Sequence, residues 1–207
     1  KSDLCSDLVG EYPELQGVMG KYFALSQGFE EDVANSISDH YLPTGLTSAL
    51  PKKPFSYSIS IVDKIDSLVG FFLINEKPSS SKDPFALRRA AIGILRIVIE
   101  NKLSINLRDL ISYSIRLYEE QGVNVENEKT EIEILDFLKE RMKNILKLKN
   151  IKIDIIEASI SSHTGDSYLD LYKKNLLMNK YINKDVGINI ISSYKRASNI
   201  TDKARQG

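Results

Sequence analysis

The stretch Ser81–Val98 reads SKDPFALRRAAIGILRIV, and it decides the fold class. Asp83 followed by Pro84 is typical of a helix N-cap and the first helical position. Behind this pair, apolar residues recur three and four positions apart, at Leu87, Ala91, Ile94, Leu95 and Val98. That spacing places them on one face of an α-helix. The stretch therefore predicts an amphipathic helix over residues 84–101.

Similar helical spacing extends along the rest of the chain. We expect further helices over residues 4–12, 14–25, 30–41, 55–74, 107–121, 132–148, 153–161, 167–182 and 185–200. Two short segments, 58–62 and 151–156, also have strand propensity because β-branched residues are frequent in them. We favour helix in both; for 151–156 the reason is that no partner strand is visible. The predicted fold class is all-α, with about eight to ten helices.

The composition is that of an ordinary folded protein, and its charge is unevenly distributed. The 207 residues are 42% hydrophobic, and 28 Lys and Arg balance 28 Asp and Glu. Residues 1–128 hold 13 basic against 18 acidic residues, whereas residues 129–207 hold 15 against 10. Two domains of opposite charge, divided near a polar stretch at 123–129, fit this pattern, and the basic half suits RNA phosphate. Chance variation of charge is the alternative.

Several classes of protein are disfavoured by what the sequence lacks. Cys5 is the one cysteine, so no disulfide can form within the chain, and we expect it to be a small buried hydrophobe. The longest apolar runs, such as Leu68–Ile74, are far shorter than the roughly 20 residues that cross a bilayer. The chain opens without an initiator Met or a secretory signal. We expect a fragment of a longer cytoplasmic protein.

Four stretches carry a resemblance to a known family. They read DLVGEYPELQGVMG at 7–20, HYLP at 40–43, VDKIDSLVGFF at 62–72 and SKDPFALRRAA at 81–91, the last followed by ILRI at 94–97. In order and spacing they resemble the β subunit of bacterial two-subunit glycyl-tRNA synthetases. A weaker likeness to the C-terminal anticodon-binding domain of that family lies in LDFLKER at 135–141 and YKRASNI at 194–200.

The resemblance implies both a domain organisation and a role. It implies an HD-domain-like helical module over 1–125, followed by a partial helical anticodon-binding (DALR-like) domain over 126–207. The whole enzyme would join glycine to tRNA-Gly with ATP and Mg²⁺ as an α2β2 assembly, with adenylate chemistry on the α subunit. This chain would contribute tRNA binding and subunit contacts, with no catalytic residue or cofactor of its own and no membrane or DNA partner. Alone, it is expected to be inactive.

The HD-like module would carry a degenerate metal site. HD phosphohydrolases hold metal ions with a histidine, a His-Asp pair and a later aspartate, and these metals activate water. The resemblance places these positions at Ser2, Asp3, His40 and Asp63. Because a serine hydroxyl is a poor divalent-metal ligand, we expect no metal here, and we interpret His40 as a hydrogen-bonded packing residue. An active HD-type phosphohydrolase stays an alternative function, as does a helical scaffold without an RNA role.

Two groups of residues are candidates for tRNA contact. The first, near the start of the helix predicted over 84–101, consists of Lys82, Arg88 and Arg89, for which internal salt bridges with Asp63, Asp66 or Asp83 are the alternative. The second, on the last predicted helix, consists of Tyr194, Lys195, Arg196 and Asn199, for which a solvated helix face is the alternative. The neighbouring apolar run Ile188, Ile190 and Ile191 is expected in the core.

Two positions depart from the pattern of the resembling family. Asn75 and Ser80 stand where that family usually has glycine. Asparagine tolerates the left-handed backbone region, so Asn75 in place of glycine is expected to cost little. Ser80 puts in doubt any close backbone approach at its loop.

Overall fold

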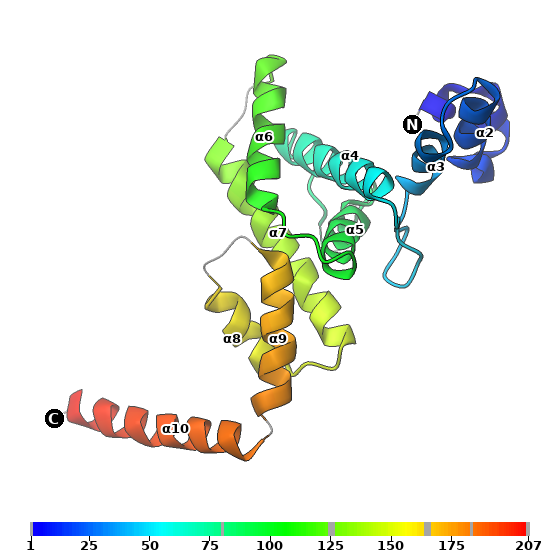
Figure 1. Cartoon of the computed structure of the whole chain (residues 1–207). Helices are drawn as coiled ribbons and strands as arrows, with labels where there is room; N and C mark the ends of the chain where they lie inside the picture. The colour runs from blue at the N-terminus through cyan, green and yellow to red at the C-terminus, as the bar shows by residue number, and fades with distance from the viewer. Residues whose placement is uncertain (1, 80, 124–126, 164–166, 183, 206–207) are drawn as a thin grey trace. The chain divides into compact units, whose positions relative to one another are not determined.

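The computed structural model describes residues 2–79, 81–123, 127–163, 167–182 and 184–205 (Figure 1). These residues form two 3₁₀ turns, η1 (Ser2–Cys5) and η2 (Pro13–Leu15), and ten α-helices, with no strand among them. The helices are α1 (Asp7–Glu11), α2 (Val18–Ser26), α3 (Glu31–Asp39), α4 (Pro54–Leu73), α5 (Leu87–Glu100), α6 (Leu107–Glu120), α7 (Asn127–Leu148), α8 (Ile153–Ser161), α9 (Tyr168–Ile182) and α10 (Asp185–Arg205). The predicted all-α class is confirmed.

The start of α5 differs from its prediction. The helix begins at Leu87 rather than at Pro84, because Pro84 and Phe85 form a turn and Ala86 is left-handed, with φ of 56°. The Asp83 carboxylate nevertheless caps the helix from a distance, accepting hydrogen bonds from the Leu87 amide at 2.9 Å and the Arg88 amide at 3.1 Å. An internal anion therefore already satisfies donors at this helix N-terminus.

The chain forms two compact units. The first comprises residues 1–145 with 166–169, and the second comprises residues 146–165 with 170–207. The domain boundary predicted after residue 125 stays a prediction.

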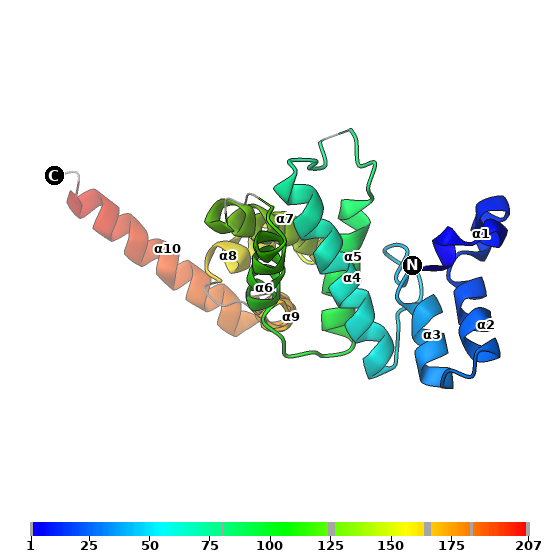
Figure 2. The ribbon, with the colours of Figure 1, turned by 90° about the horizontal axis from the view of Figure 1, so that it is seen from above.

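In the first unit, α4 is the central helix and packs against α3, α5 and α6 (Figure 2). The apolar face predicted for α5 is confirmed, since its five members are at most 1% exposed: Leu87, Ala91, Ile94, Leu95 and Val98. From α4, Phe72 is buried against Phe137 of α7, with ring centroids 5.4 Å apart. Each such side chain contributes roughly 1.5–3 kcal/mol by burial. This core fixes the positions of α4 and α5.

The end of α4 is closed by Asn75, one of the two positions that depart from the family pattern. Asn75 follows the helix in the left-handed region, with φ of 61°. The Glu76 amide donates to Phe71 O at 2.8 Å and the Asn75 amide to Phe72 O at 3.1 Å, which closes the last turn. Ser80 lies outside the described residues, so the expectation for its loop stays a prediction.

In the second unit, α8 and α9 share a buried polar contact. Ser159 Oγ donates to Asn175 Oδ1 at 2.7 Å, and Asn175 Nδ2 donates to Leu171 O at 2.9 Å. All three side chains are buried, so each polar group has a partner where water has no access.

Two burial predictions are wrong. Ile188, Ile190 and Ile191 of α10 are 53%, 64% and 36% exposed rather than in the core. Helical spacing shows which side chains share a face, but it does not show what covers that face. Cys5 is also exposed, because it ends the 3₁₀ turn η1 instead of lying inside an α-helix. None of the helices in the described ranges is long and apolar enough to cross a membrane.

Candidate functional site

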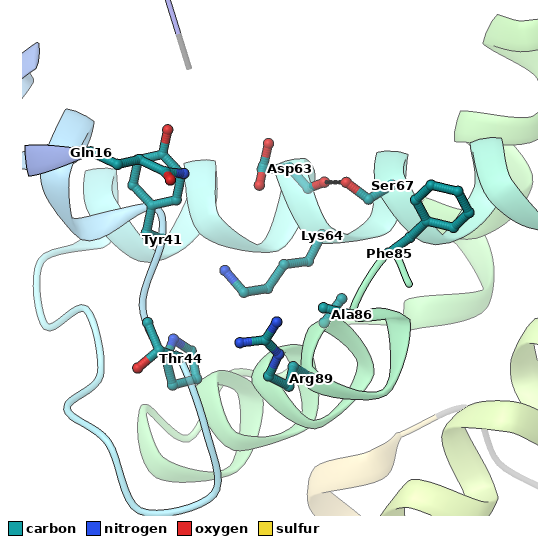
Figure 3. Close-up of a pocket in the computed structure, with 11 residues that line it drawn as sticks. Gln16, Tyr41, Thr44, Asp63, Lys64, Ser67, Phe85, Ala86 and Arg89 are labelled. Atoms are coloured by element: carbon teal, nitrogen blue, oxygen red, sulfur yellow. Dashed lines mark hydrogen bonds between the residues drawn. The ribbon is translucent and has the colours of Figure 1, made fainter. Parts of the chain in front are cut away.

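The first unit contains a pocket of about 530 Å³ between α4 and α5 (Figure 3). It is lined by Gln16, Tyr41, Pro43, Thr44, Asp63, Lys64, Ser67, Phe85, Ala86, Arg89 and Ala90. Every one of these residues except Thr44 belongs to the stretches 7–20, 40–43, 62–72 and 81–91 on which the family resemblance rests. Segments far apart in the sequence therefore converge on one pocket.

Lys64 gives the pocket a buried positive charge. Its ammonium donates to His40 O at 2.8 Å, to Leu42 O at 2.9 Å and to Ser60 Oγ at 2.8 Å. The two carbonyls and the hydroxyl accept these hydrogen bonds from the ammonium. Lys64 thus ties the segment after α3 to α4, and it lines the pocket with a cationic side chain.

Two features of α5 support this arrangement. A Cβ at Gly93 would lie 2.9 Å from Lys64 Cε, so the glycine makes room for the lysine stem. Arg96 Nη1 donates to Gly45 O at 2.7 Å and to Ser48 O at 2.9 Å. Lys64 on α4 and Arg96 on α5 therefore both bind carbonyl groups of the segment after α3. This segment carries the pocket residues Tyr41, Pro43 and Thr44.

The structure separates the adjacent arginines of the first candidate group. Arg88 is half-buried, donates to the carbonyls of Ser79 and Lys82, and lies 3.9 Å from the Asp83 carboxylate. Arg89 is exposed, extends into the space between α4 and α5, and makes no ion pair with any residue that the structure describes (Figure 3). Lys82 is exposed on the preceding loop. Arg88 therefore has an internal role, whereas Arg89 is available to a ligand.

Arg141 of α7 is a further cation that the sequence reasoning missed. Its guanidinium lies 4.7 Å from the centre of the Phe137 ring, and its buried Nε has no hydrogen-bond partner among the described residues. Burial, followed by the charge of nearby Arg88, lowers the pKa of Arg141. The four-residue spacing from Phe137 was the available sequence signal. Arg141 is therefore a second guanidinium near Arg88 and the Asp83 carboxylate.

The degenerate HD positions have structural partners. The buried Asp3 carboxylate accepts hydrogen bonds from the Gly17 amide and, at 3.3 Å, from the Tyr41 hydroxyl. Asp63 lies on α4 and lines the pocket. The side chain of Ser2 is outside the described residues. Asp3 therefore holds the segment before α2 in place.

His40 ends α3 as a buried histidine. Its Nδ1 lies 2.8 Å from Ile37 O, so Nδ1–H donates there, and the buried Nε2 has no described partner. Burial lowers the pKa of His40, against smaller opposing effects of the Ile37 carbonyl and Asp63. The ring is therefore neutral at pH 7.

Across the described ranges, no group of three or more His, Cys, Asp and Glu side chains is arranged to hold a metal ion. Asp3 and His40 instead make hydrogen bonds to the backbone at Gly17 and Ile37.

The second candidate group lies on α10, in the second unit. Tyr194, Lys195 and Arg196 are exposed, and the side chain of Asn199 lies outside the described residues. At 100° per residue, Tyr194 shares its face with the exposed Ile190 and Val186, four and eight positions before it. Lys195 and Arg196 point away from that face. The tyrosine and the cations of this group therefore do not form one surface.

Comparisons with known proteins agree on one family. The model of the glycyl-tRNA synthetase beta subunit family matches residues 1–161. The glycine--tRNA ligase beta subunit of Rickettsia canadensis is 46% identical over 200 residues, 97% of this chain and 29% of the relative. That of Ruegeria sp. is 36% identical over 206 residues, 100% of this chain and 28% of the relative. The chain therefore spans less than a third of these relatives, and it belongs to the glycyl-tRNA synthetase beta subunit family.

Proposed function

We propose that this chain contributes tRNA binding and subunit assembly to the ATP-dependent joining of glycine to tRNA-Gly in the cytoplasm. The proposal rests on the family, whose members named above are glycine--tRNA ligase beta subunits. The α subunit of an α2β2 enzyme forms the adenylate with ATP and Mg²⁺. Residues 1–125 serve as an HD-like module without metal chemistry, and residues 126–207 serve as part of an anticodon-binding domain.

The pocket between α4 and α5 is the observation that carries the RNA-binding part of this proposal. Arg89 reaches it without an ion pair to a described residue, and the buried Lys64 ammonium adds positive charge. Guanidinium groups bind phosphate through paired N–H donors. The α5 N-terminus itself is not the phosphate site, since the Asp83 carboxylate already caps it. The phosphate is therefore bound by cationic side chains of the pocket, mainly by Arg89.

Lys195 and Arg196 of α10 form a second contact. They are exposed and lie in the half of the chain that carries more basic than acidic residues. Attraction between such a surface and RNA phosphate does not depend on base sequence and weakens as salt rises. Tyr194 could stack on an unpaired base, but it lies on a different face of α10 from Lys195 and Arg196. A base on Tyr194 and a phosphate on the two cations would therefore occupy different faces of the helix.

A salt series of tRNA binding tests this function. Fluorescence anisotropy with a labelled tRNA-Gly transcript is measured between 50 and 300 mM salt for the wild-type chain, Arg89→Gln and Lys195→Ala/Arg196→Ala. We expect wild-type affinity to fall steeply with salt, and each removed phosphate contact to reduce the slope of log K against log[salt] by about 1. Lys52→Gln, which removes an exposed lysine outside the pocket, is the matched control. Absence of tRNA binding would favour a helical scaffold without an RNA role.

A further inference from the structure

The pocket between α4 and α5 carries both signs of charge. Lys64 and Arg89 line it together with the Asp63 carboxylate (Figure 3). A phosphate by itself would be attracted by the two cations and repelled by the carboxylate. An ionised carboxylate accepts hydrogen bonds at about four sites and donates none. The charges therefore favour a ligand that combines an anionic group with a separate hydroxyl or amino donor.

Phe85 adds a flat apolar surface to the same pocket. One face of its ring stacks on Phe71, with centroids 3.9 Å apart and planes inclined by 17°, yet 43% of the residue stays exposed. Phe71 thus fixes the orientation of the ring before any ligand binds. An exposed aromatic ring is a platform on which a nucleic-acid base stacks with little dependence on base identity.

The size of the pocket limits the ligand to a small unit. At about 530 Å³ it lies within the roughly 300–1,000 Å³ typical of small-molecule sites. That space suits one nucleotide, whereas a base-paired duplex would stay outside. A ribonucleotide combines an anion, a hydroxyl donor and a flat ring in one unit of this size.

We propose that this pocket takes one unpaired ribonucleotide of the bound RNA. Its phosphate lies against Arg89, its base stacks on Phe85, and its 2′-hydroxyl donates a hydrogen bond to Asp63. This inference rests on the proposed RNA-binding function and adds to it a means of distinguishing RNA from DNA, because the 2′-hydroxyl is the group that DNA lacks.

The test compares AMP with 2′-deoxy-AMP by NMR titration of the ¹⁵N-labelled chain, followed at the amides of residues 85–90. We expect AMP to shift these signals, and 2′-deoxy-AMP to bind about tenfold more weakly, as the loss of one hydrogen bond to a charged acceptor predicts. Asp63→Ala should bring the ratio of the two affinities to within about twofold. Asp66→Ala, on the same helix and outside the pocket, should leave the ratio near ten.

A parallel measurement of tRNA affinity distinguishes failure of the ribonucleotide inference from failure of the proposed RNA-binding function. In one outcome, tRNA binds and Arg89→Gln weakens that binding, but AMP does not shift the signals of residues 85–90. In another, AMP shifts them, but Asp63→Ala leaves the ratio of the AMP and 2′-deoxy-AMP affinities unchanged. Either outcome shows that the ribonucleotide inference is wrong, while the RNA-binding function stands. If AMP binds in the pocket while tRNA affinity is unchanged by Arg89→Gln, the pocket serves a free nucleotide, which overturns the inference. If tRNA does not bind at all, the proposed function fails as well.

Discussion

Replacement of Lys64 by methionine should destabilise the first unit. Methionine keeps most of the length and apolar volume of the lysine stem beside Gly93 and removes only the ammonium. Three hydrogen bonds disappear together, those to His40 O, Leu42 O and Ser60 Oγ. The substitution therefore isolates the energetic contribution of the buried charge.

The magnitude follows from what each acceptor retains. Leu42 O keeps a hydrogen bond from Ser60 Oγ at 2.6 Å, so it does not lose every partner. The His40 carbonyl loses a buried charged donor, at a cost of about 1–3 kcal/mol, and loss of the other two bonds adds a similar amount. Removal of a buried charge returns part of its desolvation penalty. The expected net decrease in the free energy of unfolding is about 2–4 kcal/mol.

Hydrogen exchange at the amides of α4 and α5 measures this change within the first unit alone. A loss of about 2–4 kcal/mol accelerates exchange that occurs through unfolding of that unit by about thirty-fold to several hundred-fold. Lys52→Met, at an exposed position, should change the free energy of unfolding by less than about 0.5 kcal/mol. Unchanged or slower exchange in Lys64→Met would show that the buried ammonium does not stabilise the unit, because its desolvation would then cost at least as much free energy as its hydrogen bonds contribute.

Three further predictions concern packing, pH and activity. Gly93→Ala should cost about 1–3 kcal/mol in thermal unfolding, because the new Cβ meets Lys64 Cε at 2.9 Å, and the cost should shrink when Lys64→Ala is present as well. Burial lowers the pKa of His40 in the folded chain below the ordinary histidine value of 6.5. Between these two pKa values the unfolded chain binds more protons than the folded chain, so the free energy of unfolding should fall as pH drops from 6.5 toward the lowered value. Urea titrations should show this slope reduced in His40→Gln; a slope equal to that of wild type would contradict it. The chain alone should show no glycine-dependent ATP–pyrophosphate exchange, and measurable exchange would overturn the assignment of adenylate chemistry to the other subunit.

Local sequence signals were sufficient for most of the helices and for one buried face. In α5, the spacing of Leu87, Ala91 and Ile94 identified the side chains that the core takes up. The start of that helix was misplaced because Ala86 adopts a left-handed conformation, which local propensity disfavours for alanine. On α10, Ile190 was misassigned to the core because periodicity carries no information about the covering surface.

The site depended on tertiary contacts that no local pattern encodes. Arg88 and Arg89 are adjacent and chemically identical, and they differ because the carbonyls of the preceding loop and the Asp83 carboxylate meet Arg88. Lys64 lies in a largely apolar helix, and its role became visible only when the segment after α3 was placed beside it. Phe85 was predicted inside a helix, and the turn before α5 instead presents its ring to the pocket.

The central claim is that Arg89 binds RNA phosphate, and the most direct measurement is the salt dependence of tRNA affinity in wild type and Arg89→Gln. We expect Arg89→Gln to bind tRNA more weakly than wild type at low salt, with a slope of log K against log[salt] that is smaller by about 1. Lys52→Gln should match wild type in both quantities. Equal affinities and equal slopes for wild type and Arg89→Gln would contradict the claim.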